Sequence, residues 1–202
     1  MFGDPVTNPK GWDKITINDV CKSIVRGPFG SALKVAFFVL PSDTTYKVYE
    51  QKNAIQQSAA IGDSYIQQEK FVELKRFECK PGDIIMSCSG TIGKFLQLPD
   101  NAEPGIINQA LCKFTLSERI LPVVFITYMQ QSINELETKG SGIQNIGAVT
   151  YIKNMRLNLP PLSLQTQFAE FVEQADKSKF ELQRTIAELD ATYKSILREN
   201  LG

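Results

Sequence analysis

The side chains that could do chemistry in this sequence gather in three turns rich in glycine and polar residues. These turns, residues 27–34, 87–94 and 140–145, combine glycines with hydroxyls, amides and lysines. Such groups donate hydrogen bonds to phosphates, and Gln and Asn can also pair with adenine, as Lys and Arg can with guanine. The turns therefore indicate either contacts to a nucleic acid or ordinary surface loops.

Catalytic chemistry has little support in the sequence. The 202 residues include no histidine, the usual general base and the commonest metal ligand. Residues 88–94 approach a phosphate-binding loop, but Cys88 replaces its first glycine and Phe95 replaces its Ser or Thr. The four scattered cysteines form no zinc-binding pattern. We therefore expect no catalytic residue, no metal and no cofactor.

The composition predicts a globular protein. Hydrophobic residues make up 43% of the chain, and no apolar run is long enough to span a membrane. Because 22 basic residues balance 22 acidic ones, any DNA must be met by a local patch of charge. The absence of a secretory signal pattern and the spacing of the cysteines predict reduced thiols in the cytoplasm.

The hydrophobic period changes near residue 162, where two architectures join. Before it, short segments favour strands at Ile15 to Ile17 and at residues 35–40, 83–88, 94–98, 110–116 and 155–159. Helices are predicted at residues 19–25 and 122–137, the latter from apolar residues spaced by three and four. Residues 42–70 are polar without a clear period, which predicts a long loop or irregular insertion.

After Pro160 and Pro161, Ser163 is placed to cap a helix that continues to about Asn200. Its apolar residues follow a heptad pattern with one stutter. At 1.5 Å per residue a helix of this length extends about 57 Å, so most of it must project and its apolar stripe needs a partner helix. The predicted pairing residues are Phe168, Phe171, Ala175, Leu182, Ile186, Leu189, Tyr193 and Ile196.

The turns occur in an order, and with a C-terminal sequel, that resembles the specificity subunits of type I restriction-modification enzymes, which choose the DNA sequence to be methylated or cut. The matching segments span nearly the whole chain from Trp12: Gly27–Ser31 with Leu33–Lys34, Pro81–Ile85 with Ser89–Gly93, Gly140–Gly142 with Gln144–Asn145, and Leu159–Leu162 with Gln165 and Phe168–Ala169. One position departs from the family pattern, because Leu164 replaces the acidic residue that usually precedes the glutamine opening the helix.

The resemblance implies an α+β protein: a mixed-sheet target-recognition domain over residues 1–162, then one long coiled-coil-forming helix over residues 163–202. It implies a non-catalytic subunit that reads one half of a bipartite double-stranded DNA target and docks methyltransferase and restriction subunits. The first part carries a net charge of +2 and the second of −2, which permits this division.

Two questions of assembly stay open at this point. The opening from Phe2 to Trp12 resembles the linker before a second recognition domain, so the chain is either the C-terminal half of a longer subunit or a natural half-subunit. As a half-subunit it would pair with a second copy through the long helix.

The alternative function is that of a coiled-coil adaptor that never binds DNA, although an adaptor leaves the polar turns unexplained.

The expected DNA contacts divide into two classes. Lys34, Lys94 and Ser141 are predicted to contact phosphates, helped by the hydroxyls of Ser31, Ser89 and Thr91. Base reading is assigned to the polar insertion and the third turn, at Tyr46, Lys47, Gln51, Lys52, Asn53, Gln144 and Asn145.

Overall fold

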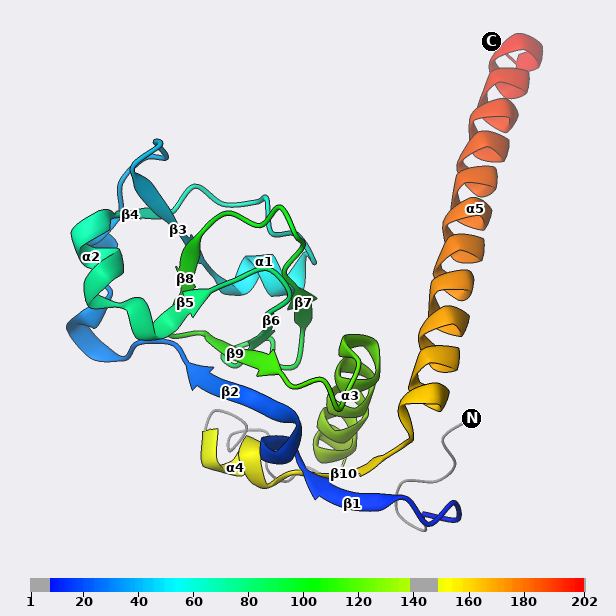
Figure 1. Cartoon of the computed structure of the whole chain (residues 1–202). Helices are drawn as coiled ribbons and strands as arrows, with labels where there is room; N and C mark the ends of the chain where they lie inside the picture. The colour runs from blue at the N-terminus through cyan, green and yellow to red at the C-terminus, as the bar shows by residue number, and fades with distance from the viewer. Residues whose placement is uncertain (1–7, 139–148, 202) are drawn as a thin grey trace.

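The chain folds into a body of three layered sheets from which one long helix extends (Figure 1). The structure is a computed structural model that describes residues 8–138 and 149–201. Within these residues the strand orders of the sheets are β1-β10, β2-β9-β6-β7 and β4-β3-β8-β5. The arrangement confirms the predicted α+β class.

The central sheet is antiparallel, and its strand β6 is buried on both faces. It consists of β2 (Cys21–Arg26), β9 (Leu111–Leu116), β6 (Ile84–Ser87) and β7 (Phe95–Gln97). Side chains alternate along a strand, so Ile84 and Met86 enter one apolar cluster while Ile85 enters another on the opposite face. Burial on both faces explains why β6 is continuously apolar from Ile84 to Met86.

The second sheet is mixed and packs on the central one. It consists of β4 (Tyr65–Gln67), β3 (Thr45–Tyr49), β8 (Gly105–Ile107) and β5 (Glu78–Cys79), and only the β3 and β8 pair is parallel among these strands. Tyr49 and Ile107 face the central sheet. Val48 and Ile106 face the other way, into a cluster that includes Phe71 of α2 (Gln68–Glu73). The short helix α1 (Gln51–Ile55) contacts β6 and β7.

The third sheet closes the body next to the helices. Its strands β1 (Asp13–Thr16) and β10 (Arg156–Leu159) pair antiparallel, with Ile15 opposite Leu157. Helices α3 (Pro122–Thr138) and α4 (Val149–Asn154) cover the first apolar cluster through residues such as Phe125 and Ile152. Helix α3 confirms the predicted helix at residues 122–137, and β6, β7, β9 and β10 confirm four of the predicted strands.

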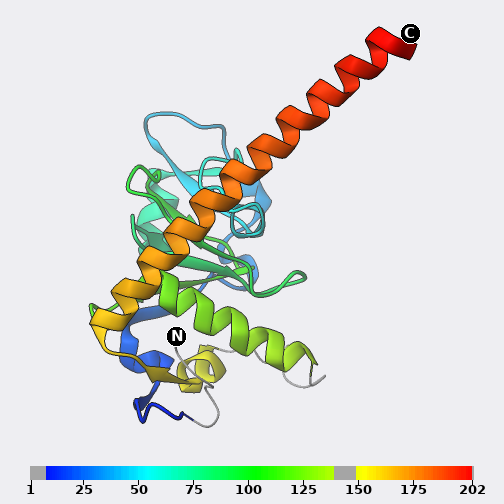
Figure 2. The ribbon, with the colours of Figure 1, turned by 90° about the vertical axis from the view of Figure 1, so that its right-hand side faces the viewer.

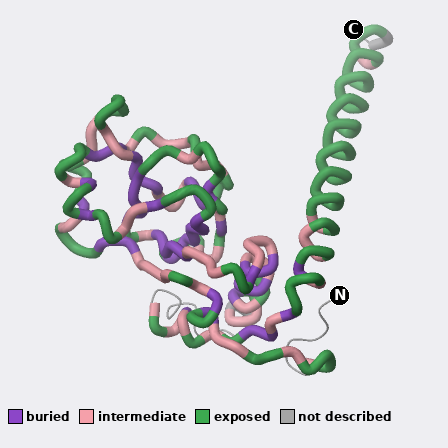
Figure 3. Tube along the Cα trace, viewed as in Figure 1, coloured by how far each residue is buried: buried purple, intermediate pink, exposed green. Residues whose placement is uncertain are grey.

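Helix α5 (Leu162–Leu201) has 40 residues and projects far from the body (Figures 1 and 2). It begins one residue before Ser163, so Ser163 lies inside the helix. The junction is held by Gln165, whose side chain is fully buried and bonds to Leu121 N (2.8 Å), Arg119 O (3.0 Å) and Pro160 O (2.9 Å). Beyond this base the helix is exposed along its length (Figure 3).

Two predicted elements are wrong. Residues 19–25 form the end of a single 3₁₀ turn, η1 (Ile17–Val20), and then strand β2, which pairs with β9. A capping box between Thr16 and Asp19 starts that turn, but the chain then becomes extended because β2 has a partner strand. Residues 35–40 form the 3₁₀ turn η3 (Val35–Phe37) and one isolated bridge at Val39, and not a strand, since no sheet covers Val35.

The polar insertion, residues 42–70, is regular where a loop was predicted. It contains β3, α1, β4 and the start of α2. Its strands showed no clear alternation because β3 buries a lysine, Lys47, on the same face as Tyr49. Pairing with β8, distant in sequence, stabilises β3 as a strand.

Candidate nucleic-acid interface

The first two polar turns lie side by side and are joined by Arg26. This residue ends β2, directly before the first turn (residues 27–34), and its guanidinium stacks over Phe29 at 5.5 Å from the ring centroid. Its Nη2 donates to Ser89 Oγ (3.3 Å) and to Cys88 O (3.4 Å) in the second turn (residues 87–94), and its Nε donates to Gln109 O (2.9 Å). One side chain, that of Arg26, therefore connects three loops at the same end of neighbouring strands in the central sheet: those that follow β2 and β6 and the one that precedes β9.

The second turn is also fixed from its other sides. Gln51 of α1 donates to the carbonyl oxygens of Ser89 and Thr91, the latter at 3.1 Å. Gly93 has φ +73°, and a Cβ at this position would lie 2.9 Å from Ile133 of α3. Glycine is needed here for both reasons. The turn therefore presents its side chains from a rigid backbone.

The exposed groups of these turns suit an anionic ligand. Ser31, Lys34, Ser89, Thr91 and Lys94 are all exposed. Among the described residues, neither Lys34 nor Lys94 has a hydrogen-bond or ion-pair partner for its ammonium group. Free ammonium and hydroxyl donors on a fixed backbone can bind phosphate oxygens without first breaking internal contacts.

Comparison with known sequences decides what kind of protein presents these turns. Residues 9–189 match the family model for the type I restriction modification DNA specificity domain. The chain belongs to this family. The match covers both described turns, the whole polar insertion and most of α5.

Individual specificity subunits are also similar to this chain. The chain is 22% identical over 196 residues to the type I restriction enzyme MjaVIII specificity subunit of Methanocaldococcus jannaschii, and the match covers 95% of this chain and 42% of that protein. The HsdS subunit of Thermoanaerobacter tengcongensis has the same fold, with a TM-score of 0.67 and 18% identity over 93% of this chain and 43% of that one. The S subunit of M. genitalium has a TM-score of 0.52 and 12% identity, covering 93% and 45%. The specificity domain thus spans less than half the length of each relative.

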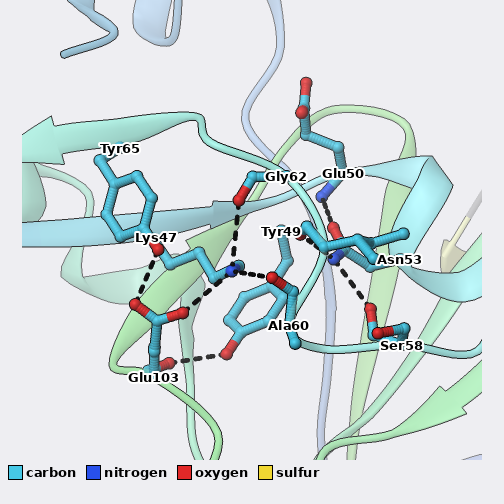
Figure 4. Close-up of polar contacts among 10 residues, drawn as sticks. Lys47, Tyr49, Glu50, Asn53, Ser58, Ala60, Gly62, Tyr65 and Glu103 are labelled. Atoms are coloured by element: carbon cyan, nitrogen blue, oxygen red, sulfur yellow. Dashed lines mark hydrogen bonds and ion pairs between the residues drawn. The ribbon is translucent and has the colours of Figure 1, made fainter. Parts of the chain in front are cut away.

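Two predicted base-reading residues of the specificity domain are instead part of its interior (Figure 4). Lys47 is 1% exposed, and its Nζ contacts Glu103 Oε1 at 3.0 Å. Asn53 is fully buried, where its Oδ1 accepts from Glu50 N (2.8 Å) and its Nδ2 donates to Ser58 O (3.0 Å) and Ile61 O (2.9 Å). Neither side chain is accessible to a base edge in this structure, which corrects both assignments.

The environment of Lys47 also shifts neighbouring pKa values. Burial and a hydrogen bond to Glu103 Oε2 (2.7 Å) raise the pKa of Tyr65 to about 12. Burial alone would raise the pKa of Glu103, but the hydrogen bonds from Tyr65 and Lys47 and the charge of Lys47 hold it below the ordinary value. Glu103 is therefore a carboxylate engaged by two partners.

The other predicted base readers have mixed surroundings. The Tyr46 ring stacks on Phe71 with centroids 3.8 Å apart, and Lys52 Nζ pairs with Glu50 at 2.9 Å. Gln51 supports the second turn through its hydrogen bonds to that backbone. Ser141, Gln144 and Asn145 lie outside the described residues.

Sequence reasoning missed Arg26 and Gln109. An arginine directly before a glycine-rich turn is the only local signal for Arg26, because its hydrogen-bond partners lie 62 or more residues away. Gln109 contributes a backbone carbonyl, which residue type does not reveal. Gly27 marks the same convergence, since a Cβ there would clash with the backbone oxygen of Asn108 at 1.8 Å.

The described residues hold neither a metal-binding cluster of three or more acidic, cysteine or histidine side chains nor a helix able to span a membrane. The four cysteines are not disulfide-bonded. Burial raises the pKa of Cys21 to about 12, and it also raises that of Cys79. Such thiols are poor nucleophiles at neutral pH.

Proposed function

We propose that this chain is a non-catalytic DNA sequence-recognition unit that reads one half of a bipartite target. The observation that carries the proposal is the convergence of the two polar turns through Arg26. This convergence brings together the loops that carry exposed, unpaired Lys34 and Lys94, in a chain of the DNA specificity domain family. Phosphates would position the chain, and polar side chains nearby would read bases.

The long helix would serve assembly. Leu182, Ile186 and Leu189 are between 59% and 64% exposed on α5, too much apolar surface for a helix that works alone in water. We propose that α5 pairs with another helix of the same assembled enzyme. That enzyme would also contain methyltransferase and restriction subunits and would work in the cytoplasm. Where this chain occurs alone, a second copy supplies the partner helix. Residues 1–162 would then be the recognition domain and residues 163–202 the spacer.

One member of the predicted pairing set has a different role. Phe168 is half-buried and packs against the first apolar cluster of the body. It lies in the first two turns of α5, where the helix contacts α3. Phe168 therefore fixes the direction in which α5 leaves the body, and the surface offered to a partner begins at Phe171.

DNA binding is tested by electrophoretic retardation of a random duplex pool by the full chain at several salt concentrations. We expect binding that weakens steeply as salt rises, because phosphate contacts release counterions. Replacing Lys34 and Lys94 with Ala should lower the salt slope by about two units, with no change in the bases preferred. Replacing Lys179 and Lys194, which are exposed on α5, makes the matched control with the same loss of charge.

The outcomes separate the two functions that the sequence left open. Absence of binding even at low salt would overturn the proposal and favour a coiled-coil adaptor. Equal losses in the α5 control and the turn variant would mean that charge alone, and not these turns, attracts DNA.

A further inference from the structure

Two buried polar side chains in Figure 4, those of Lys47 and Asn53, support one short stretch of backbone. Lys47 Nζ donates to the carbonyl oxygens of Ala60 (3.3 Å) and Gly62 (3.4 Å). Asn53 Nδ2 donates to those of Ser58 and Ile61. Burying an ammonium group and an amide is unfavourable unless their hydrogen bonds are made, so these contacts select one conformation for residues 58–62.

The same network holds a second segment against the first. One carboxylate oxygen of Glu103 accepts a hydrogen bond from Lys47, and the other accepts one from Tyr65. The backbone oxygen of Glu103 accepts from Tyr49 Oη (2.7 Å). Pro99 O accepts from Ala102 N (3.0 Å), which closes the preceding turn. The loop at residues 57–62 and the turn at residues 99–103 are therefore fixed relative to each other.

These two segments and the end of β7 enclose a basin of about 540 Å³. Three exposed amides, Gln57, Gln97 and Asn101, line it together with small apolar side chains. Within the described part of the chain, none of the three amides forms a hydrogen bond. Glu103 is the one charged residue among the lining residues, and it is already engaged. The basin thus presents unpaired donors and acceptors from an ordered support.

We infer that this basin reads base edges, with Gln57, Gln97 and Asn101 as specificity-determining residues. A carboxamide offers a donor and an acceptor side by side, the pattern that matches N6 and N7 of adenine in the major groove. Lys47 and Asn53 are then positioning residues, which hold the reading surface without touching DNA. The inference rests on the proposed DNA-binding function and names the part of it that selects sequence.

The position of the basin fits this role. Lys94, a proposed phosphate contact, directly precedes β7, and Gln97 ends that strand. A strand rises about 3.3 Å per residue, so the two residues are about 10 Å apart along it. This separation is within the width of the major groove, roughly 12 Å, so a duplex held by a phosphate contact at Lys94 would pass close to the basin.

The test is selection of binding sites from a randomised duplex pool by the wild-type full chain and by three variants. Gln97→Leu and Asn101→Leu remove hydrogen bonding while keeping similar bulk, and Gln57→Gly suits the φ of +51° at that position. Each variant should lose discrimination at one A·T pair by roughly 5- to 150-fold, with the salt slope of binding unchanged. Gln68→Leu is the matched control, because Gln68 is an exposed amide of the same body outside the basin.

The outcomes keep this inference distinct from the proposed function. If the wild type binds no DNA, the proposed function fails. If the wild type selects a sequence and all three variants select the same one, the basin inference fails while DNA recognition stands. A variant that weakens binding to every sequence and lowers the salt slope would also overturn the inference, since its residue would then contact phosphate. Thermal unfolding of each variant shows that the body remains folded.

Discussion

Leu111 in β9 and Leu182 in α5 are the same residue type, yet Leu111 is fully buried and Leu182 is 64% exposed. The contrast holds for the regions around them. The body buries most of its large apolar residues with its own chain, in three clusters between and beside its sheets. Helix α5 presents an apolar stripe that no other part of the described chain covers at Leu182, Ile186 or Leu189. The body therefore builds its own core, whereas we propose that the helix contacts another molecule through its exposed stripe.

The largest effect that we predict concerns pairing through the apolar stripe of α5. If the chain pairs with itself, Leu182→Asp with Leu189→Asp should weaken association at least about a thousandfold. Each leucine contributes about 2 to 3 kcal/mol on burial, and each new carboxylate would be desolvated. Sedimentation velocity measures the effect, while the melting temperature of the body should not change.

Phe180 offers a matched control on the same helix. It is exposed, but at 100° per residue it lies roughly 200° around the helix from Leu182, on the opposite face. Phe180→Asp should therefore leave the self-association unaffected. A wild-type chain that is monomeric at micromolar concentration would refute self-pairing and leave only docking to another subunit.

The second prediction concerns a buried ion pair in the body. Lys113 Nζ lies 3.0 Å from Asp83 Oδ2 in a pair that is nearly excluded from water. Lys113→Ala should destabilise the body by about 3 to 5 kcal/mol, because it leaves a buried carboxylate unpaired. Lys22→Ala in the adjacent strand β2 removes an exposed pair with Glu118 at 3.7 Å and should cost no more than about 0.5 kcal/mol. Urea unfolding of both variants checks the difference, and similar losses would contradict it.

A smaller effect is expected at the junction of the two regions. Gln165→Ala removes hydrogen bonds to Leu121, Arg119 and Pro160 and should destabilise the protein by about 2 kcal/mol. Gln167→Ala, two residues further along α5 and exposed, should change stability by less than about 0.5 kcal/mol. Thermal unfolding distinguishes them. An unchanged melting temperature for Gln165→Ala would show that packing of Phe168 alone holds the junction.

The smallest effect depends on pH. Because the pKa of Glu103 is lowered in the folded state, its ionised form contributes stability above about pH 4.5, and this contribution is lost as pH falls through the folded-state pKa. The stability gap between wild type and Glu103→Gln should therefore be present at pH 6 and close towards pH 3. Its size should be about 1 kcal/mol, because the carboxylate is 49% exposed and screened by solvent. Urea unfolding across this range measures the gap, and a constant gap would contradict the assignment.

Regular segments of this chain are predictable from local pattern, and segments defined by distant partners are not. Helices α3 and α5 and strands β6, β7, β9 and β10 follow their apolar pattern, because one buried face leaves a periodic signal and two buried faces leave a continuous apolar run. Residues 19–25 contain the same kind of spacing by chance and become β2 through pairing with β9, about 90 residues away in the register. The apolar run at residues 35–40 has strand composition, but it joins a sheet only through one bridge between Val39 and Tyr65 of β4.

The candidate site divides in the same way. The residue types and order of the turns indicate the family and the groups that we propose bind phosphate, since the properties of a glycine or an exposed lysine do not depend on distant partners. The roles of Lys47 and Asn53 are different, because a polar residue in an insertion is read from sequence as exposed when its partners are unknown. Their burial depends on Glu103 and on the carbonyl groups of residues 58–62.

The sequence alone was enough to exclude histidine chemistry, to predict the long helix with its exposed apolar stripe, and to locate the two polar turns that the structure describes. These properties follow from composition and from periodicity within one element. The tertiary structure was needed to show that Arg26 joins two turns, that Lys47 and Asn53 support the backbone of residues 58–62, and that Gln57, Gln97 and Asn101 share a basin. Each of these depends on strands and loops that are far apart in the chain, and their meeting is decided by packing of the whole body.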